Sequence, residues 1–442
     1  MPEQPPTEPY APPSSPTTTL AFKLVVIAGL LLSFLIPVAL IDGLVLEREQ
    51  RRNQAITEIH GSWANHQLVA GPFLVVPVRT TTGTVNAYFL PEALRIDAQM
   101  GTEIRHRGIY SAAVFKSDIS LSGRFSCPDF SRFTPAPESI FWDRASIYLA
   151  ISDMRGVGEA VRLDWDGQAM SMDAGTSTLP ELSSGVMATV AVDPRRFGAI
   201  GRSFSLTLNL KGSQRLSLLP VGKVTTASIR SPWPAPSFRG NFLPEARTVG
   251  PNGFSATRKV LDINRGLPQA WIGDRREIRS SAFGVDLSIL VDNYRSALRA
   301  TKYAILFVFS AFVAFFFIEF LQDKRIHPIQ YLLIGCATIM FYLLLLSLSE
   351  HVRFSAAYFA AAFAVVILVG TYTHGVFARR RITSAVTLIY SGLYAYLFSL
   401  LRMEDYSLLL GSLGLFIALG LIMHLTRKVD WYKLEQAHAP PF

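Results

Sequence analysis

The chain has 442 residues, of which 50% are hydrophobic and 17% are charged, and its formal net charge is +9. Hydrophobicity this high favours membrane segments beside one folded domain over several soluble domains. The basic residues are spread thinly, which argues against nucleic-acid binding and leaves a mild attraction to anionic lipid or envelope polymer. The two cysteines, Cys127 and Cys336, provide no disulfide framework or Cys-rich zinc site, and each is expected to be a small buried hydrophobe.

The N-terminal region combines a polar tail with a long apolar run. Residues 1–22 are rich in Pro, Ser and Thr and are expected to form a disordered tail. Residues 23–41 contain an uncharged run of 18 residues, long enough to cross a hydrocarbon core of about 30 Å. A cleavable signal peptide is the alternative interpretation, but the helical pattern continues beyond the run. We therefore expect an uncleaved transmembrane helix, with Pro37 as a kink and a helical stalk over 44–67.

The middle region, residues 42–300, favours strands. Segments such as GPFLVVPV and SFSLTLNL are short and rich in β-branched or alternating apolar residues, and turn residues separate them. In SFSLTLNL the apolar side chains recur at every second position, as in a strand with one buried face. The pattern predicts a β-rich domain of antiparallel strands with a sandwich-like fold.

The C-terminal third, residues 301–425, holds five more apolar runs of membrane-spanning length. We expect a bundle of five transmembrane helices here, followed by a short polar tail over 426–442. The five runs cover about 303–321, 329–349, 356–377, 384–401 and 406–425.

The short connections between these runs alternate between two charge patterns. Because short cytoplasmic loops carry an excess of Lys and Arg, the more basic set and the C-terminus are expected in the cytoplasm. With six spans the N-terminal tail is expected there too, and residues 42–300 on the other side of the membrane. The basic set holds Lys324, Arg325, Arg379, Arg380, Arg381, Arg427, Lys428 and Lys433, whereas the other set holds Arg353, and Arg402 offset by Glu404 and Asp405.

Three residues that could do chemistry end the second C-terminal run, which reads FYLLLLSLSEH. They are Ser349, Glu350 and His351. Adjacent residues on a helix point about 100° apart, so the three cannot converge within one element. One interpretation is an interfacial cap in which Glu350 pairs with Arg353, and the other is a role in gating or in docking the outer domain.

Glu319 ends the first C-terminal run, where ionisable groups are costly and often functional. With His327 and His374 at the same membrane level, it could ligate a metal or relay protons. The alternative is a structural ion pair near the basic loop 324–325. Glu319 and Glu350 are expected at opposite membrane faces, about 30 Å apart, which excludes a hydrolytic metal centre built from both.

No motif in the sequence specifies a known catalytic or cofactor site. H-E-x-x-H, G-x-S-x-G, P-loop and dinucleotide-binding patterns are absent. The motifs DMRG and GLPQAW read as turns with anchoring side chains. The histidines of the middle region, His60, His66 and His106, are expected to be structural. We therefore predict no catalytic, cofactor or metal-binding residue.

Several longer motifs resemble the CreD family of inner-membrane proteins, also called the cell-envelope integrity family. The likeness covers about residues 23–350 well and the last three runs more loosely. The motifs are LEREQRRNQAITEIHGSW, GPFLVVPV, RGIY, DMRG, PSFRGNFLP, GLPQAW, FGVDLSILVDNYRSALRATKYAILFVF, IHPIQYLLIG and FYLLLLSLSEH.

The resemblance implies a bacterial inner-membrane protein with one N-terminal span, a periplasmic domain and a C-terminal span cluster. It also implies links to envelope integrity, colicin tolerance and the response to β-lactams, but no catalytic activity. The family motifs provide candidate functional residues without assigned roles. These are Arg107, Tyr110, Asp153, Arg155, Trp271, Asp292, Tyr294, Arg295, Glu319, His327, Pro328, Glu350 and His351.

Three functions follow from these observations. The first is a non-enzymatic envelope protein whose outer domain binds a protein or polymer partner while the spans anchor it in the bilayer. The second is a transporter or lipid-handling protein, although charged residues near the membrane midplane and inverted repeats are not evident. The third is an envelope hydrolase or transferase that depends on Glu350 or His351. The sequence indicates no oligomeric state.

Overall fold

A computed structural model of the chain describes residues 20–134, 136–177, 179, 182–197, 201–274, 278–287, 293–322, 326–403 and 406–427. These residues form two compact units. The helical unit comprises the described residues up to Gln50 and from Asn293 onward, and the β unit comprises those from Arg51 to Leu287. The predicted tails lie almost entirely outside the described residues.

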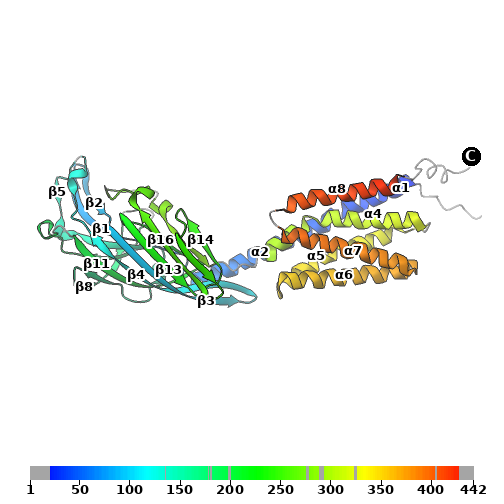
Figure 1. Ribbon diagram of the computed structural model, residues 1–442, viewed down its shortest axis with the longest axis horizontal. Helices are drawn as coiled ribbons and strands as arrows, with labels where there is room; N and C mark the ends of the chain where they lie inside the picture. The colour runs from blue at the N-terminus through cyan, green and yellow to red at the C-terminus, as the bar shows by residue number, and fades with distance from the viewer. Residues whose placement is uncertain are drawn as a thin grey trace, which may run out of the picture. The chain divides into compact units, whose positions relative to one another are not determined.

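Eight α-helices are described, and most of them belong to the helical unit (Figure 1). Helix α2 begins in the helical unit, and its residues from Arg51 onward belong to the β unit. The helices are α1 (Leu20–Ser33), α2 (Leu35–Trp63), α3 (Asn293–Thr301), α4 (Ala304–Gln322), α5 (Pro328–Ser349), α6 (Phe354–Phe377), α7 (Arg380–Arg402) and α8 (Ser407–Thr426).

The predicted N-terminal anchor is a long apolar helix. Helices α1 and α2 are separated only by Phe34, and together they form one candidate span over Phe22–Trp63. Pro37 lies three residues after the break and has no amide hydrogen for the carbonyl of Ser33. The missing hydrogen bond accounts for the break close to the predicted kink.

The C-terminal helices form an apolar cluster, but not all of the five predicted spans are established. Helices α5, α6 and α7 are each long and apolar enough to cross a membrane. Helices α3 and α4 pass this test only as a pair, which is bent by 45°. Within the described part of α8, the apolar stretch Leu408–Gly420 is shorter than a span. The described chain therefore has four candidate spans in all, or five with the bent pair.

Aromatic side chains fill the interior of the helical unit. The ring of Phe341 on α5 packs against Tyr394 on α7, with centroids 4.6 Å apart, and against Tyr358 on α6 at 5.2 Å. All three side chains are buried. Among the described helices, this packing leaves the bundle closed between α5, α6 and α7.

Both cysteines are free and exposed, which corrects the expectation of burial. Cys336 follows the buried Gly335 on α5, and one residue further along a helix turns the side chain by about 100°, away from the interior. Cys127 lies just beyond the end of strand β4. An apolar neighbourhood in the sequence therefore does not fix the face on which a helix residue lies.

The β unit contains two sheets. The larger has ten strands, with a main path in the order β14-β18-β12-β1-β6-β10-β9 and with β2, β5 and β17 at its side. Its strands are β1 (Gln67–Thr80), β2 (Gly83–Phe89), β5 (Ser139–Ile140), β6 (Ser146–Ile151), β9 (Asp173–Thr176), β10 (Ser184–Thr189), β12 (Arg215–Leu219), β14 (Pro236–Gly240), β17 (Ala270–Ile272) and β18 (Phe283–Leu287).

The second sheet has eight strands in the order β15-β16-β13-β3-β4-β11-β7-β8. Its strands are β3 (Ala93–Arg107), β4 (Tyr110–Phe125), β7 (Arg162–Trp165), β8 (Gln168–Ser171), β11 (Arg202–Ser213), β13 (Val224–Ser231), β15 (Ala246–Gly250) and β16 (Gly253–Leu261).

The sheets are mixed, whereas the sequence predicted antiparallel strands. Most neighbours are antiparallel, but β1 pairs with β12 in parallel and β3 pairs with β13 in parallel. Each parallel pair joins strands that are distant in the sequence, which requires long crossover connections. Local alternation of apolar residues predicts a strand but carries no information about the direction of its neighbour.

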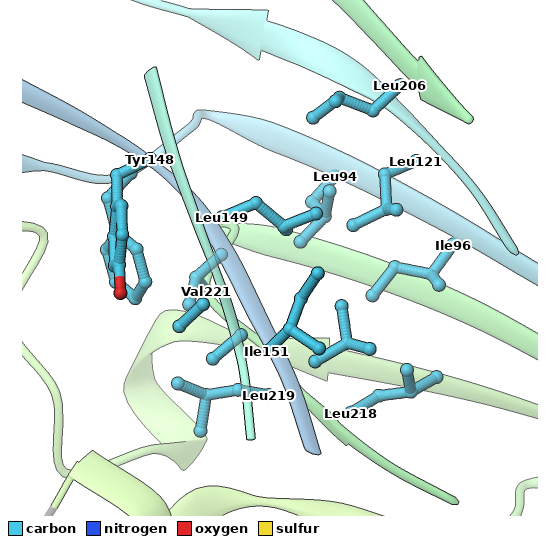
Figure 2. Close-up of a cluster of buried hydrophobic side chains, with 14 of the residues drawn as sticks. Leu94, Ile96, Leu121, Tyr148, Leu149, Ile151, Leu206, Leu218, Leu219 and Val221 are labelled. Atoms are coloured by element: carbon cyan, nitrogen blue, oxygen red, sulfur yellow. The ribbon is translucent and has the colours of Figure 1, made fainter. Parts of the chain in front are cut away.

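A single hydrophobic core joins the two sheets. Figure 2 shows Leu149 and Ile151 of β6 among side chains of the eight-stranded sheet, including Leu94 of β3 and Leu121 of β4. Tyr148 lies on the opposite side of β6, where its hydroxyl donates to the carbonyl of Leu182 at 2.7 Å. The buried inner faces leave the outer face of the eight-stranded sheet for polar side chains.

The last turns of α2 pack on this outer face. Ile59 joins the buried Ala112 and Val114 of β4, and Ile56 and Trp63 pack beside them. The spacing of Ile56, Ile59 and Trp63 places the three side chains on one side of the helix. This contact fixes the position of Trp63 in the β unit.

Candidate functional sites

The DMRG motif anchors the end of α2 within the β unit. Asp153 caps a short 3-10 helix, Met154–Gly156, and accepts hydrogen bonds from Nε and Nη2 of Arg155 at 2.9 and 2.6 Å. The carboxylate also accepts from the backbone N–H groups of Arg155 at 3.1 Å and Asn65 at 2.9 Å, while Arg155 donates to the carbonyl of Gly61 at 2.9 Å. Hydrogen bonds from the Arg155 guanidinium lower the pKa of the Asp153 carboxyl to about 2.

The RGIY motif is the tight turn between β3 and β4. Arg107 and Tyr110 form the last pair of the ladder, so Gly108 and Ile109 are the two turn residues. Gly108 has φ of +60°, which glycine adopts without strain. The guanidinium of Arg107 also pairs with Glu58 on α2 at 2.6 Å. Two predicted functional residues therefore shape a hairpin and attach it to α2.

Trp271, from the GLPQAW motif, belongs to the core of the β unit. Its ring stacks on Tyr88 with centroids 5.3 Å apart and meets the edge of Phe73 at 6.3 Å. The side chain is 7% exposed. Its contacts indicate a packing role.

A basic cluster surrounds Trp63 on the outer face of the eight-stranded sheet. The cationic groups of Arg105, Lys211 and Lys116 lie 4.9, 5.5 and 5.7 Å from the ring centroid. The indole Nε1 donates to the carbonyl of Phe115 at 3.3 Å. We call Trp63, Arg105, Lys116 and Lys211 the Trp63 cluster. None of its basic residues was singled out from the sequence, because the register of two strand pairs is needed to bring them together.

The charges of the Trp63 cluster are poorly balanced. Lys116 and Lys211 stand directly opposite each other on β4 and β11. Like charges at opposed positions in neighbouring strands destabilise a sheet. Arg105 pairs with Glu103 at 2.9 Å, but neither lysine is paired with a carboxylate among the described residues. Cation–π attraction offsets part of this repulsion.

Glu319 forms a polar cluster in the helical unit. Its carboxylate pairs with Lys23 of α1 and accepts hydrogen bonds from the N–H of Ile326 at 2.9 Å and the hydroxyl of Tyr331 at 3.0 Å. The Glu319 side chain is 12% exposed. The ion-pair interpretation is therefore supported, but the partner is Lys23. The expected basic neighbours, Lys324 and Arg325, lie outside the described residues.

His327 and Pro328 form the start of α5. Nδ1 of His327 accepts from the N–H of Ile329 at 3.3 Å, and the His327 N–H donates to Gln330 at 3.0 Å. Pro328 occupies the first turn, where its missing N–H costs nothing. Both residues therefore act in capping. Within the described parts of the chain, no three His, Cys, Asp or Glu side chains gather as a metal site would require.

Glu350 forms a second polar cluster, which joins three helices of the helical unit. It accepts a hydrogen bond from the hydroxyl of Tyr294 on α3 at 2.9 Å. Nη1 of Arg48 on α2 lies 3.8 Å from its other oxygen. The neighbouring Asn293 donates to the carbonyl of Ser349. No ion pair joins Glu350 to Arg353 among the described residues, so the expected i+3 pair is wrong.

Ser349, Glu350 and His351 do not converge on one point. The hydroxyl of Ser349 donates to the carbonyl of Leu346 at 2.9 Å, and Nδ1 of His351 lies 3.1 Å from the carbonyl of Ser347. Glu350 and Glu319 lie near opposite ends of α5, a helix of 22 residues. Of the remaining candidates, Arg295 is exposed on α3 and Asp292 lies outside the described residues.

Comparisons with known proteins identify the chain's relatives. The family profile described as "Inner membrane protein CreD" matches residues 19–432. The inner membrane protein CreD of Escherichia coli (strain K12) is 33% identical over 428 residues, which cover 93% of this chain and 94% of that protein. The chain belongs to the CreD family. It is therefore an inner-membrane protein, and its apolar helices make it multi-pass.

The two carboxylate clusters, around Glu319 and around Glu350, have the same kind of role in this CreD-family protein. Each cluster joins helices far apart in the chain, since Lys23 and Glu319 link α1 to α4, and Tyr294 and Glu350 link α3 to the end of α5. Both carboxylates are largely shielded from solvent, which strengthens such charged and hydrogen-bonded contacts. In this CreD-family protein they join helices that are distant in the sequence.

Proposed function

We propose that this CreD-family protein acts in cell-envelope integrity and in the response to envelope and β-lactam stress without being an enzyme. Support comes from the contacts of the motif residues. Asp153, Glu319 and Glu350 are each engaged by basic or hydroxyl neighbours within their own unit. Trp271 packs in the core and His327 caps a helix. These residues are occupied by structural partners.

The proposed role is to bind an anionic envelope polymer through the β unit. The carrying observation is the Trp63 cluster, where Lys116 and Lys211 oppose each other at a cost in stability. An anion placed between the two ammonium groups would remove their repulsion and gain from both. Trp63 remains partly exposed and adds an apolar contact for a sugar. An acidic polysaccharide combines both features.

The proposed topology counts six spans, with the bent pair α3–α4 as one of them and α8 as another, and places both termini in the cytoplasm and the β unit in the periplasm. The alternation of basic and less basic connections between the apolar runs supports it. Compartment-sensitive reporters fused at each terminus and inserted at the exposed turn after Arg107 would test it. Periplasmic reporter activity at either terminus would contradict it.

The binding role is tested with full-length protein in nanodiscs and purified peptidoglycan sacculi as the probe. Replacing Lys116 and Lys211 together by Gln should lower the bound fraction at equal sacculus concentration, with affinity falling about tenfold. Arg124→Gln with Lys259→Gln is the matched control, because both residues are exposed on strands of the same sheet and the charge change is equal.

Each outcome decides the proposal. Binding that is lost in the cluster variant and kept in the control supports it. Equal binding by the wild type and the cluster variant would exclude the Trp63 cluster as the polymer site. Photo-cross-linking in cells from Asn209, beside the cluster, then separates an envelope protein from a polymer as the partner. Release of sacculus fragments by the purified protein would contradict the non-enzymatic role.

A second function, transport or lipid handling, finds no support in the interior of the described helices. The space lined by Phe315, Ile334 and Val376 has no room for a water molecule. Tyr and Phe side chains close the bundle elsewhere between α5, α6 and α7. The proposal therefore rests on the β unit.

A further inference from the structure

An open groove runs along the pair of helices α6 and α7 on the surface of the helical unit. It begins beside the loop between the two helices and continues for about three turns of α7. Its polar lining consists of His374 from α6 and Arg380, Thr383, Ser384, Thr387 and Ser391 from α7. Leu388, which is 74% exposed, provides an apolar wall. Helix α7 is thus polar on a face that a transmembrane helix normally keeps apolar.

Positive charge concentrates at one end of this groove. Arg379, Arg380 and Arg381 are consecutive and exposed at the start of α7. Neither Arg380 nor Arg381 is paired with a carboxylate among the described residues. No side chain caps the first turn of α7, so its N–H groups also face this end. The lining contains no acidic side chain.

Beyond the arginines at the start of α7, Thr and Ser hydroxyl groups line the groove. Oγ1 of Thr383 lies 3.4 Å from Nδ1 of His374 and donates to the carbonyl of Arg379 at 3.3 Å, and Ser384 donates to the carbonyl of Arg381 at 3.0 Å. The hydroxyl groups of Thr387 and Ser391 make no hydrogen bond among the described residues. Thr387 lies seven residues beyond Arg380, about 10 Å along the helix axis. A hydroxyl without a partner at that depth in a bilayer costs free energy, and an acceptor from a bound molecule would satisfy it.

The order of chemical groups along the α6–α7 groove matches one class of molecule. A phospholipid presents an anionic phosphate, then ester carbonyls that accept hydrogen bonds, then an acyl chain. The groove presents a cation, then hydroxyl donors, then an apolar wall, in the same order. Basic pockets between membrane helices recognise anionic headgroups in this way. A second transmembrane helix fits less well, because its docking would bury the charge of Arg380 without a partner.

We propose that the α6–α7 groove binds an anionic phospholipid. Arg380 contacts the phosphate, and Thr387 donates a hydrogen bond to a phosphate or ester oxygen. The acyl chain lies along Leu388. This site belongs to the helical unit and is independent of polymer binding by the β unit. The inference therefore stands whether or not the Trp63 cluster binds a polymer.

Native mass spectrometry of the full-length protein, released from mixed micelles, tests the site. The probes are dioleoyl phosphatidylglycerol and dioleoyl phosphatidylcholine at equal concentration. The wild type should retain phosphatidylglycerol in preference to phosphatidylcholine. Arg380→Gln should lower that retention about fivefold, the effect of one basic residue at a lipid headgroup. Thr387→Val, which keeps the shape of the side chain, should lower it as well.

Arg402→Gln is the matched control, because Arg402 ends the same helix, carries the same charge and lies outside the groove. Its retention should equal that of the wild type. Equal retention of the two lipids by the wild type would overturn the proposal, and so would equal losses in Arg380→Gln and Arg402→Gln. Full competition by inorganic phosphate would assign the groove to a soluble phosphate instead. Lipid-independent dimers lost in Thr387→Val would assign it to a second copy.

Discussion

The hydroxyl of Tyr294 donates to the carboxylate of Glu350 at 2.9 Å, although the two residues are 56 positions apart. Tyr294 is buried on α3 and the Glu350 side chain is 9% exposed. A hydrogen bond to a charged acceptor in such a place is stronger than one between neutral groups. It joins a short amphipathic helix to the end of a membrane span, and Arg48 completes the contact from α2.

The first prediction concerns this bond. Tyr294→Phe and Glu350→Gln should each lower the stability of the protein, and a double-mutant cycle should give a coupling of about 1–2 kcal/mol. The measurement is thermal unfolding in detergent, followed by helix content. Tyr303→Phe is the control, because its hydroxyl makes no hydrogen bond among the described residues. Strictly additive effects of the two substitutions would show that the bond contributes nothing.

The second prediction concerns the ion pair between Lys23 and Glu319. Lys23→Met leaves a largely buried carboxylate without its cation and should cost about 3 kcal/mol. Combining it with Glu319→Gln removes the charge and should restore part of the lost stability. Lys302→Met is the control, because Lys302 is exposed and forms no ion pair among the described residues. The same unfolding assay is used. If the double variant were no more stable than Lys23→Met, the unpaired charge of Glu319 would not be the cause of the lost stability.

Sequence reasoning could find these carboxylates but not their partners. Glu319 and Glu350 were conspicuous because ionisable groups at the ends of apolar runs are rare. The partners expected for them were neighbours in the chain, Arg353 and the basic loop 324–325, because i+3 and i+4 contacts are visible in a sequence. The observed partners come from other helices. Helix packing selects them, and periodicity does not encode it.

The β unit shows the same limit. Alternation in the segment around Phe204 predicts a strand with one buried face, and the structure has β11 there. The opposition of Lys116 and Lys211 follows only once the register of β4 and β11 is known. Trp63 was recognised as part of a helix face. The basic residues around it were not, because they come from three strands.

The third prediction concerns pH. Hydrogen bonds from Arg155 lower the pKa of Asp153 to about 2 in the folded protein, from an ordinary value near 4. A folded-state pKa below the unfolded value stabilises the fold above the unfolded pKa, and this contribution disappears as the pH falls from about 4 to about 2. It amounts to at most about 2 kcal/mol, because Arg155 remains half exposed to solvent.

The test compares the wild type with Asp153→Asn in the unfolding transition of the β unit, followed by tryptophan fluorescence. The variant should be less stable at neutral pH, and the difference should shrink steadily between pH 4 and pH 2. Asp118→Asn is a control for a general effect of losing a carboxylate, because Asp118 is exposed and bonds to Asn209 at 2.7 Å. If the stability difference between the wild type and Asp153→Asn stayed constant between pH 4 and pH 2, the titration of Asp153 could not be its cause.

The fourth prediction concerns Gly156, which the DMRG motif places against two other segments. A Cβ at this position would lie 2.2 Å from the carbonyl oxygen of Lys211 and 2.3 Å from Nε2 of Gln67. Gln67 is buried and donates to the carbonyls of Asp153 and Lys211, so neither neighbour can move without breaking a hydrogen bond. Gly156→Ala should therefore destabilise the β unit by about 3 kcal/mol.

Gly250→Ala should change its stability little, because a Cβ there meets nothing within 4 Å. Chemical denaturation compares the two variants. Equal unfolding midpoints would mean that the DMRG motif and β11 can move apart to accept the extra methyl group without loss of stability.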